Sequence, residues 1–261
     1  MKRKYTIEER RSAILNMLHT GGRVYVEGLS ETLGVSEVSI RKDLAVLEER
    51  KLLVRTKGGA IALHQHDIYD DLSISYKQRL HAREKQLIGQ YAASLIQDGE
   101  SIIIDSGTTA MEVAKHLDGL KKLTVITNAM DIAIALNNYN RFNIIILGGT
   151  MRSVSHSTVG VSGESALKSI YCDKLFLGVD SISIKDGLST PSLEEASLNQ
   201  AMIGAAKEVI AIFDSSKYGR RTFAHIASLD RINTIVTDSN VPFELRDYIK
   251  TTTIKLHIVD V

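Results

Sequence analysis

The chain has 261 residues, of which 44% are hydrophobic, 24% charged and 5% aromatic. This composition excludes a disordered, collagen-like or disulfide-stapled protein. Its 32 Lys and Arg nearly balance 31 Asp and Glu, which excludes a protein that is basic or acidic throughout. Residues 1–62 nevertheless carry 12 of these cations and 8 of these acids, and residues 63–261 carry the other 20 and 23. The net charges of +4 and −3 indicate one basic module at the amino-terminal end.

Motifs for export, metal binding and cofactor binding are missing from the chain. Its single cysteine, Cys172, excludes an internal disulfide, and no Cys/His cluster has zinc-site spacing, so a reducing, cytoplasmic setting is expected. Charged residues follow the basic Met1–Lys4, where a signal peptide needs an apolar core. No apolar run approaches the roughly 20 residues of a membrane helix, and no nucleotide-binding, metalloprotease or esterase motif occurs. We therefore expect no cofactor, no metal and no membrane partner.

The basic module begins with two predicted helices. Residues 7–18 place apolar side chains on one face, with Thr6 as N-cap and Gly21–Gly22 at the end. Residues 23–26 favour a brief strand. A short second helix then ends at Gly34, which permits a sharp turn.

A third helix follows this turn and has an exposed polar face. Ser36 is its N-cap, and Ile40, Leu44 and Leu47 form its buried stripe at i, i+4 and i+7. Two short helices joined by a glycine turn are typical of a helix-turn-helix, whose second helix fits the major groove of DNA. The residues left on the outer face are Glu37, Ser39, Arg41 and Lys42.

Residues 52–61 predict a β-hairpin beside the third helix. Two extended runs flank Gly58–Gly59, and the hairpin would carry Arg55 and Lys57 next to DNA phosphates. The alternative is a solvated helical bundle whose charges serve only solubility. DNA binding is favoured because the turn, the cap, the hairpin and the net charge all agree.

The motif GVSEVSIRKDL at residues 34–44, followed by LVRTKGGA at residues 53–60, resembles the DeoR-type winged helix of bacterial sugar-operon regulators. The chain departs from that pattern at four positions, namely Gly28, Ser39, Lys42 and Lys57. The resemblance implies that Ser36, Glu37, Ser39 and Lys42 face base edges, while Arg41, Arg55 and Lys57 hold the phosphate backbone. Asp43, an acid in the middle of this face, is expected to pair with a neighbouring arginine.

A polar junction separates the basic module from the rest of the chain. Residues 64–71 have no helical period, and His64 and His66 lack further metal ligands nearby, so a solvated linker is the favoured interpretation. We expect a winged helix-turn-helix domain over residues 1–62, a linker over residues 63–79 and a second domain over residues 80–261. A long helix from Tyr76 to Ile96 is predicted to join the two domains.

The larger module alternates strands and helices, which predicts an α/β domain with a mostly parallel sheet. Ligands of such sheets collect at the carboxyl ends of the strands, and several strands here end in small polar residues. The predicted helices are 110–117, 130–138, 163–170 and 192–207. The predicted strands are 101–104, 123–127, 143–147, 174–178, 209–213, 234–237 and 254–259.

The loop Asp105–Thr109 carries the clearest binding signal. Backbone N–H groups at the following helix start, together with the Ser106, Thr108 and Thr109 hydroxyls, suit a phosphate group, and Gly107 allows close approach. Asp105 suits sugar hydroxyls instead, so the implied ligand carries a phosphate and hydroxyls. Taken alone, the loop is equally well explained as an N-cap turn.

The same body resembles the DeoR-type sensor domain, which is related in fold to ribose-5-phosphate isomerase and glucosamine-6-phosphate deaminase. The resemblance rests on Asp105–Thr109, Thr127–Asn128, Gly148–Gly149, Phe176–Asp180, Glu195–Ala196 and Asp214–Lys217. It implies a phosphorylated sugar as effector. The residues assigned to that effector are Asp105, Ser106, Gly107, Thr108, Thr109, Asn128, Gly148, Gly149, Arg152, Asp180, Glu195 and Lys217.

Two functions follow from this sequence. The favoured one is a DNA-binding transcriptional regulator, a repressor of a carbohydrate operon, which acts on operator DNA as a dimer or tetramer under control of a sugar phosphate. The alternative is a sugar-phosphate isomerase or deaminase that uses Asp180 and Glu195 as acid and base. The alternative is disfavoured because the isomerase's glycine-rich run is reduced to Lys185–Gly187 and no histidine follows Asp180 as in the deaminase.

Overall fold

A computed structural model describes residues 5–21, 23–50, 52–61 and 74–261. The chain forms two compact units, residues 1–70 and residues 71–261. The polar junction at residues 64–71, with His64 and His66, lies outside the described residues. Each unit is described by itself.

The first unit contains three helices and a three-stranded antiparallel sheet in the order β1-β3-β2 among its described residues. Thr6 and Glu9 form a capping box at its start, because the Glu9 N–H donates to Thr6 Oγ1 and the Thr6 N–H to Glu9 Oε2. The predicted helices, strand and hairpin are confirmed. Their bounds are α1 Ile7–Gly21, β1 Arg23–Tyr25, α2 Val26–Leu33, α3 Glu37–Glu49, β2 Val54–Thr56 and β3 Gly59–Ile61.

The core of this unit contains one buried acid. Ile14 of α1, Leu29 of α2 and Ile40 of α3 pack together with the other apolar stripe residues. Asp43 lies in the same interior at 1% exposure, where Arg10 Nε and Arg11 Nε of α1 donate to its two carboxylate oxygens at 2.5 and 2.8 Å. Its predicted place on the outer face of α3 is therefore wrong, although its pairing with arginine is confirmed.

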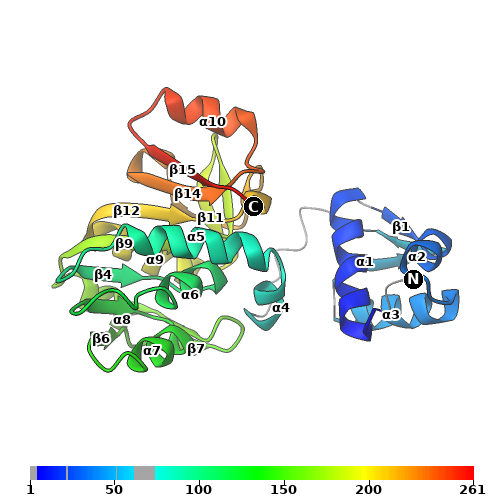
Figure 1. The fold of residues 1–261 in the computed structure, drawn as a ribbon, viewed down its shortest axis with the longest axis horizontal. Coiled ribbons are helices and arrows are strands. Elements are labelled where there is room, and N and C mark those ends of the chain that lie inside the picture. Colours follow the sequence, from blue (N-terminus) through cyan, green and yellow to red (C-terminus); the bar gives the residue numbers. More distant parts are fainter. Residues whose placement is uncertain (1–4, 22, 51, 62–73) are drawn as a thin grey trace. The chain divides into compact units, whose positions relative to one another are not determined.

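The second unit is built on a seven-stranded parallel sheet in the order β15-β14-β12-β9-β4-β5-β6 (Figure 1). All seven predicted runs are strands of this sheet, so the predicted α/β class is confirmed. The strands are β4 Ser101–Ile104, β5 Thr124–Thr127, β6 Asn143–Ile146, β9 Cys172–Gly178, β12 Ala206–Ile212, β14 Thr234–Asp238 and β15 Lys255–Val259.

Helices cover both faces of this sheet because successive strand residues point to opposite sides. In β4, Ile102 and Ile104 pack with α5, α6 and α7, whereas Ile103 packs with the cluster that contains α8, α9 and α10. Figure 1 shows α5 and α6 in front of the strands. The bounds are α5 Ala82–Ser94, α6 Thr108–Ala114, α7 Met130–Asn137, α8 Val161–Leu167, α9 Leu193–Ala205 and α10 Phe243–Lys250.

The helix predicted from Tyr76 to Ile96 is broken in the structure. It consists of α4, Ile74–Arg79, and of α5, and His81 between them adopts a left-handed backbone with φ of 51°. Figure 1 shows α4 beside the end of α5. Residues 74–79, which the sequence analysis placed in a linker, thus form a helix of the second unit. Periodicity alone missed the break because the apolar stripe continues through it.

Two small antiparallel sheets complete the unit, and neither was predicted. A hairpin joins β7 Thr150–Arg152 to β8 Ser157–Val159, and a three-stranded sheet has the order β10-β11-β13. These strands have three or four residues each, too few for a clear alternating pattern. The second sheet consists of β10 Ser181–Ser183, β11 Gly187–Thr190 and β13 Ala224–Ala227.

Candidate functional site

The first candidate surface is the outer face of α3. Ser36 caps this helix, because its hydroxyl accepts the Ser39 N–H at 3.3 Å. Gly34 ends α2 with φ of 66°, a left-handed conformation that glycine adopts without strain. The turn between the two helices therefore has the predicted chemistry, and it leaves Glu37, Arg41 and Lys42 exposed.

The hairpin of β2 and β3 lies beside α3. Arg55 pairs with Ala60 and Thr56 with Gly59, which leaves Lys57 and Gly58 at the tip. One recess is lined by residues of α2, α3 and the hairpin, and it brings together three predicted phosphate-binding cations, Arg41, Arg55 and Lys57. Three cations around one concave surface suit the phosphate backbone of a nucleic acid.

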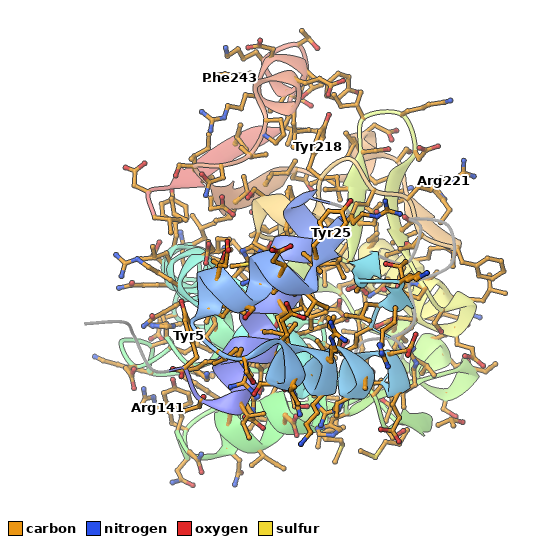
Figure 2. All side chains as sticks on the ribbon, turned by 90° about the vertical axis from the view of Figure 1, so that its right-hand side faces the viewer. Tyr5, Tyr25, Arg141, Tyr218, Arg221 and Phe243 are labelled. Carbon is orange, nitrogen blue, oxygen red and sulfur yellow. The ribbon has the colours of Figure 1, made fainter. Side chains whose placement is uncertain are left out.

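Several of these side chains already have partners within the unit. Arg41 donates to Glu37 at 2.7 Å across one helical turn, and the Ser36 and Ser39 hydroxyls lie 3.1 Å apart. Exposed pairs of this kind are weak, so the groups remain available to a ligand. Tyr25 was not among the predicted residues; its side chain is 60% exposed at the end of β1, which pairs with β3 (Figure 2).

The second candidate site is a cavity at the carboxyl ends of β4, β9 and β12, which are neighbours in the sheet. The loop Asp105–Thr109 follows β4, Asp180 follows β9, and Lys217 follows β12 in a short 3-10 helix, Ser215–Lys217. Glu195 enters from the first turn of α9. Eight of the twelve predicted effector residues line this cavity, namely Asp105, Ser106, Gly107, Thr108, Thr109, Asp180, Glu195 and Lys217.

The other four predicted effector residues are not among the residues that line the cavity. Arg152 lies behind Glu195 and donates to its carboxylate at 2.7 Å. Asn128 is buried and donates through Nδ2 to the Thr158 carbonyl at 3.0 Å. Gly149 has φ of 147°, and a Cβ there would lie 2.2 Å from the Val159 carbonyl oxygen. Gly148 lies against α8, where its carbonyl oxygen is 3.1 Å from the position of a Cβ on Gly163. Gly149 thus serves close backbone approach, whereas a Cβ on Gly148 would meet nothing within 4 Å.

Five polar residues of the cavity were missed by the sequence analysis. They are Lys77 of α4, Lys85 of α5, Ser155 between β7 and β8, Thr190 of β11 and Asn199 of α9. Lys85 carried a readable signal, because it lies on the buried stripe of α5 three residues before Ile88. Lys77 had no such signal, since only the tertiary structure brings it to Asp180.

The carboxyl groups of the cavity are held in contrasting electrostatic states. Burial raises the pKa of Asp180, but the ammonium groups of Lys77 and Lys217 outweigh it and hold this pKa below its ordinary value. Lys77 Nζ donates to Asp180 Oδ1 at 2.8 Å. Burial, reinforced by the nearby Asp180, raises the pKa of Glu195 despite its bond to Arg152. Thr190 Oγ1 lies 2.8 Å from Glu195 Oε2 and 3.4 Å from Asp180 Oδ2, so it joins the two acids.

Asp105 is a strongly perturbed acid of the cavity. Burial, followed by the charge of Glu195, raises its pKa to about 8. Its Oδ1 is buried and has no hydrogen-bond partner among the described residues. Because a buried polar atom without a partner is destabilising, Oδ1 is prepared to bond to a ligand.

Buried ammonium groups supply the positive charge. Burial lowers the pKa of Lys85 to about 8, and it also lowers the pKa of Lys217, which lies near Asp180 and Asp214. Lys85 Nζ donates to the carbonyl oxygens of Lys77 and Leu80 at 2.5 and 2.7 Å. The cavity therefore offers cations, carboxylates and hydroxyls together, a combination that suits a ligand with both an anionic group and hydroxyls.

Two further findings concern metals and membranes. No group of three or more His, Cys, Asp or Glu side chains in the described ranges could hold a metal ion. Among the residues that the structure covers, none of the helices combines the length and apolar character that crossing a membrane requires.

Comparison with known proteins gives matches over both units. A family model described as the DeoR-like helix-turn-helix domain matches residues 10–66, and one described as the DeoR C terminal sensor domain matches residues 80–239. The putative aga operon transcriptional repressor of Escherichia coli O157:H7 is 36% identical over 92% of this chain and 90% of its own. The transcriptional repressor GlcR of Bacillus subtilis is 38% identical over 88% of each chain. The lactose phosphotransferase system repressor of Lactococcus lactis is 32% identical over 97% and 98%.

Solved structures share only a distant similarity with the chain. Ribose 5-phosphate isomerase A of Methanocaldococcus jannaschii is 16% identical, with a TM-score of 0.40 over 53% of this chain and 55% of its own.

Proposed function

Since the chain belongs to the DeoR family of DNA-binding transcriptional regulators, we propose that it represses a carbohydrate operon and that a phosphorylated sugar controls its affinity for DNA. The three similar proteins described above all have the word repressor in their names: the putative aga operon repressor, the repressor GlcR and the lactose phosphotransferase system repressor. The observation that carries the proposal is the pair of sites within one chain: a cationic recess on α3 and the wing, and a cavity lined by Lys, Asp and hydroxyl groups.

In the proposed DNA complex, α3 enters the major groove. Its amino-terminal half and cap, with Ser36, Glu37, Ser39 and Lys42, read base edges. Arg41, Arg55 and Lys57 bind the phosphate backbone. Arg55 is free to do so because its pair with Glu48 is long, at 3.9 Å, and about 43% exposed on both sides.

Salt titration separates the two roles. Each phosphate contact steepens the fall of log affinity with log salt concentration by about 0.9. Arg55→Ala should therefore weaken binding to all duplexes alike and flatten the slope by about one contact, as measured by fluorescence anisotropy. Ser39→Ala should instead change the preferred sequence in a selection from a random duplex pool. An unchanged salt slope for Arg55→Ala would remove this residue from the phosphate contacts.

In the proposed effector complex, the phosphate lies between the hydroxyls of Ser106, Thr108 and Thr109 and the ammonium groups of Lys217 and Lys85. The sugar hydroxyls donate to Asp180 and to the unpaired Oδ1 of Asp105. Glu195 is held by Arg152 and Thr190 beside them. Asn128, Gly148 and Gly149 do not line the cavity and are not assigned contacts with the effector.

A thermal-shift panel of sugar phosphates and the corresponding free sugars tests this assignment. A binding sugar phosphate should stabilise the chain, and the shift should be lost in Thr108→Ala and in Lys217→Ala. Lys250→Ala is a matched control, because Lys250 is exposed on α10 and pairs only with Asp247 at 2.7 Å among the described contacts. Stabilisation by free sugars that neither cavity variant abolishes would contradict the phosphate site.

The enzymatic alternative relies on Asp180 and Glu195 as acid and base. A general base needs a carboxylate that can take up a proton, and two ammonium groups lower the pKa of Asp180. The pKa of Glu195 is raised, but its Oε2 already accepts hydrogen bonds from both Arg152 and Thr190. We therefore propose a binding role for both acids. Formation of a ketose phosphate from an aldose phosphate by the purified protein, abolished in Glu195→Gln, would reverse this assignment.

The operator-binding role has two consequences for the assembly. Two DNA-reading helices that meet successive major grooves lie about 34 Å apart, so we propose a symmetric dimer or tetramer that reads repeated half-sites. We also propose that the protein acts in the cytoplasm, where its DNA is. Sedimentation of the free protein and of its duplex complex measures the number of chains.

A further inference from the structure

Helix α4 forms one wall of the cavity and is also the first described element after residues 62–73, the stretch of sequence that leads from the DNA-binding unit. Ile74 and Lys77 of α4 line the cavity. The Ile74 N–H donates to the Val154 carbonyl at 2.8 Å, so α4 is attached to the β7–β8 hairpin. A change in the cavity can therefore reach the beginning of this unit directly.

The side chains that hold α4 in place are groups of the cavity itself. Lys77 Nζ of α4 donates to Asp180 Oδ1 at 2.8 Å. Lys85 Nζ donates to the carbonyl oxygens of Lys77 and Leu80, near the carboxyl end of α4. Lys85 is 4% exposed and also lines the cavity. The ligand and α4 thus share two binding partners, one carboxylate and one ammonium group.

A break in the helical backbone separates α4 from α5, so a movement of α4 does not require a movement of α5. His81 adopts a left-handed backbone with φ of 51°, so α4 and α5 do not form one continuous helix. Helix α5 is fixed by its apolar stripe, in which Ile88 and Ala92 are fully buried. Helix α4 has only six residues, too few to be stable without tertiary contacts.

The size of the cavity supplies the reason for movement. With α4 in place, its free space is about 50 Å³. A single water molecule needs roughly 10–15 Å³ on this measure, so the cavity holds only a few waters. A sugar phosphate is much larger. The three strand ends are anchored in the sheet, whereas α4 is attached through the buried Ile74 and through polar contacts of Lys77 and Lys85 that a ligand can replace.

We propose that α4 is the element that senses occupancy: a ligand bonds to Asp180 and Lys85 in place of α4, displaces this helix, and thereby weakens DNA binding by the preceding unit. This inference rests on the proposed function of the cavity as the effector site. The ligand shifts the equilibrium only by the difference between its affinities for the two positions of α4.

Hydrogen exchange in the full chain tests the displacement. The probes are glucose 6-phosphate, galactosamine 6-phosphate and inorganic phosphate, each also measured by thermal shift for binding. A probe that binds should speed exchange of the amides of residues 74–80 at least tenfold. Lys77→Met should produce the same increase without any probe, because it removes the bond to Asp180.

The DNA readout uses a duplex selected from a random pool for tight binding to the native chain. Lys77→Met should lower the affinity of the protein for this duplex at least tenfold, as a bound probe does, and Asp180→Asn should have the same effect. Because both substitutions remove the same Lys77–Asp180 bond, the double variant should bind the duplex no more weakly than either single variant. Lys250→Met, which removes an exposed pair on α10, should leave exchange and duplex binding at native values.

The outcomes separate this inference from the proposed function. If no sugar phosphate stabilises the chain, the effector assignment fails, and the Lys77→Met and Asp180→Asn arms still decide the coupling. If a probe binds but exchange of residues 74–80 does not change, the displacement is refuted. Native exchange and native duplex affinity in Lys77→Met would also refute it, whichever ligand binds.

Discussion

Single buried charges determine much of what each unit can do. Asp43 ties α1 to α3 through Arg10 and Arg11 in the interior of the first unit, where its carboxylate is 2% exposed. In the cavity of the second unit, Lys85 and Asp105 are held far from their ordinary pKa values by burial. The first arrangement fixes the position of α3, and the second leaves groups that a ligand can bind.

Removal of Asp43 should destabilise the DNA-binding unit. Asp43→Ala leaves two partly buried guanidinium groups without their partner, and breaking a buried ion pair in this way costs about 3–5 kcal/mol. The loss is measured as faster hydrogen exchange of the α3 amides in the full chain. Glu37→Ala removes only an exposed pair with Arg41 and should change stability by about 0.5 kcal/mol or less. Equal effects of the two substitutions would contradict the structural role of Asp43.

Asp105 should give the second unit a characteristic pH dependence. Its pKa rises from 3.8 in the unfolded chain to about 8 in the folded one, so the folded state binds more protons between these values. Stability should therefore fall as pH rises through this window, by at most about 1.4 kcal/mol per pH unit. Asp105→Asn should lessen this fall, as measured by urea unfolding between pH 5 and 7, and the remainder comes from Glu195, whose pKa burial also raises. Lys85 does not contribute to the slope between pH 5 and 7, because its pKa of about 8 in the folded chain changes the pH dependence of stability only above this range. Parallel pH profiles for the native chain and the variant would disprove the shift.

At the scale of elements, glycines show where local sequence and tertiary packing differ. Gly28 lies in α2, and a Cβ there would meet nothing within 4 Å. Gly59 lies in β3, and a Cβ there would lie 2.0 Å from the Val24 carbonyl oxygen of β1. The structure therefore has room for a side chain at Gly28 and none at Gly59, a difference that the sequence does not show.

Alanine substitution should therefore have opposite signs at these two positions. Gly28→Ala should stabilise the first unit by about 0.5–1 kcal/mol, because it removes backbone freedom from the unfolded chain and raises helix propensity. Gly59→Ala should destabilise it by about 1–3 kcal/mol, because β1 must move away from β3. Urea unfolding of both variants provides the comparison. A stabilising Gly59→Ala would show that the β1–β3 contact is not close.

The elements themselves followed from local patterns to different degrees. The seven apolar runs became the seven strands of the parallel sheet because buried parallel strands read as continuous apolar segments. The short strands of the β7–β8 hairpin and the β10-β11-β13 sheet had no such pattern. The break at His81 also escaped, because its left-handed backbone is not encoded in hydrophobic periodicity.

At the scale of the molecule, the two compact units imply two unfolding events. A ligand that binds one folded unit stabilises that unit by about 2.7 kcal/mol at a concentration of 100 times its Kd. A selected duplex should therefore raise the transition of residues 1–70, and a binding sugar phosphate that of residues 71–261. Calorimetry of the full chain with each ligand gives the measurement. A single transition raised equally by both ligands would show that the units unfold together.

The sequence by itself determined the two modules, the winged helix, the parallel sheet and the loop Asp105–Thr109, because turn residues, caps and apolar periods act over a few neighbouring positions. Only the tertiary structure decided that Asp43 is buried between two arginines, that Lys77 meets Asp180 across 103 positions of the chain, and that Gly149 approaches the backbone of Val159 closely. Charge pairing and burial depend on distances through space, and no local pattern records which distant residues the fold brings together.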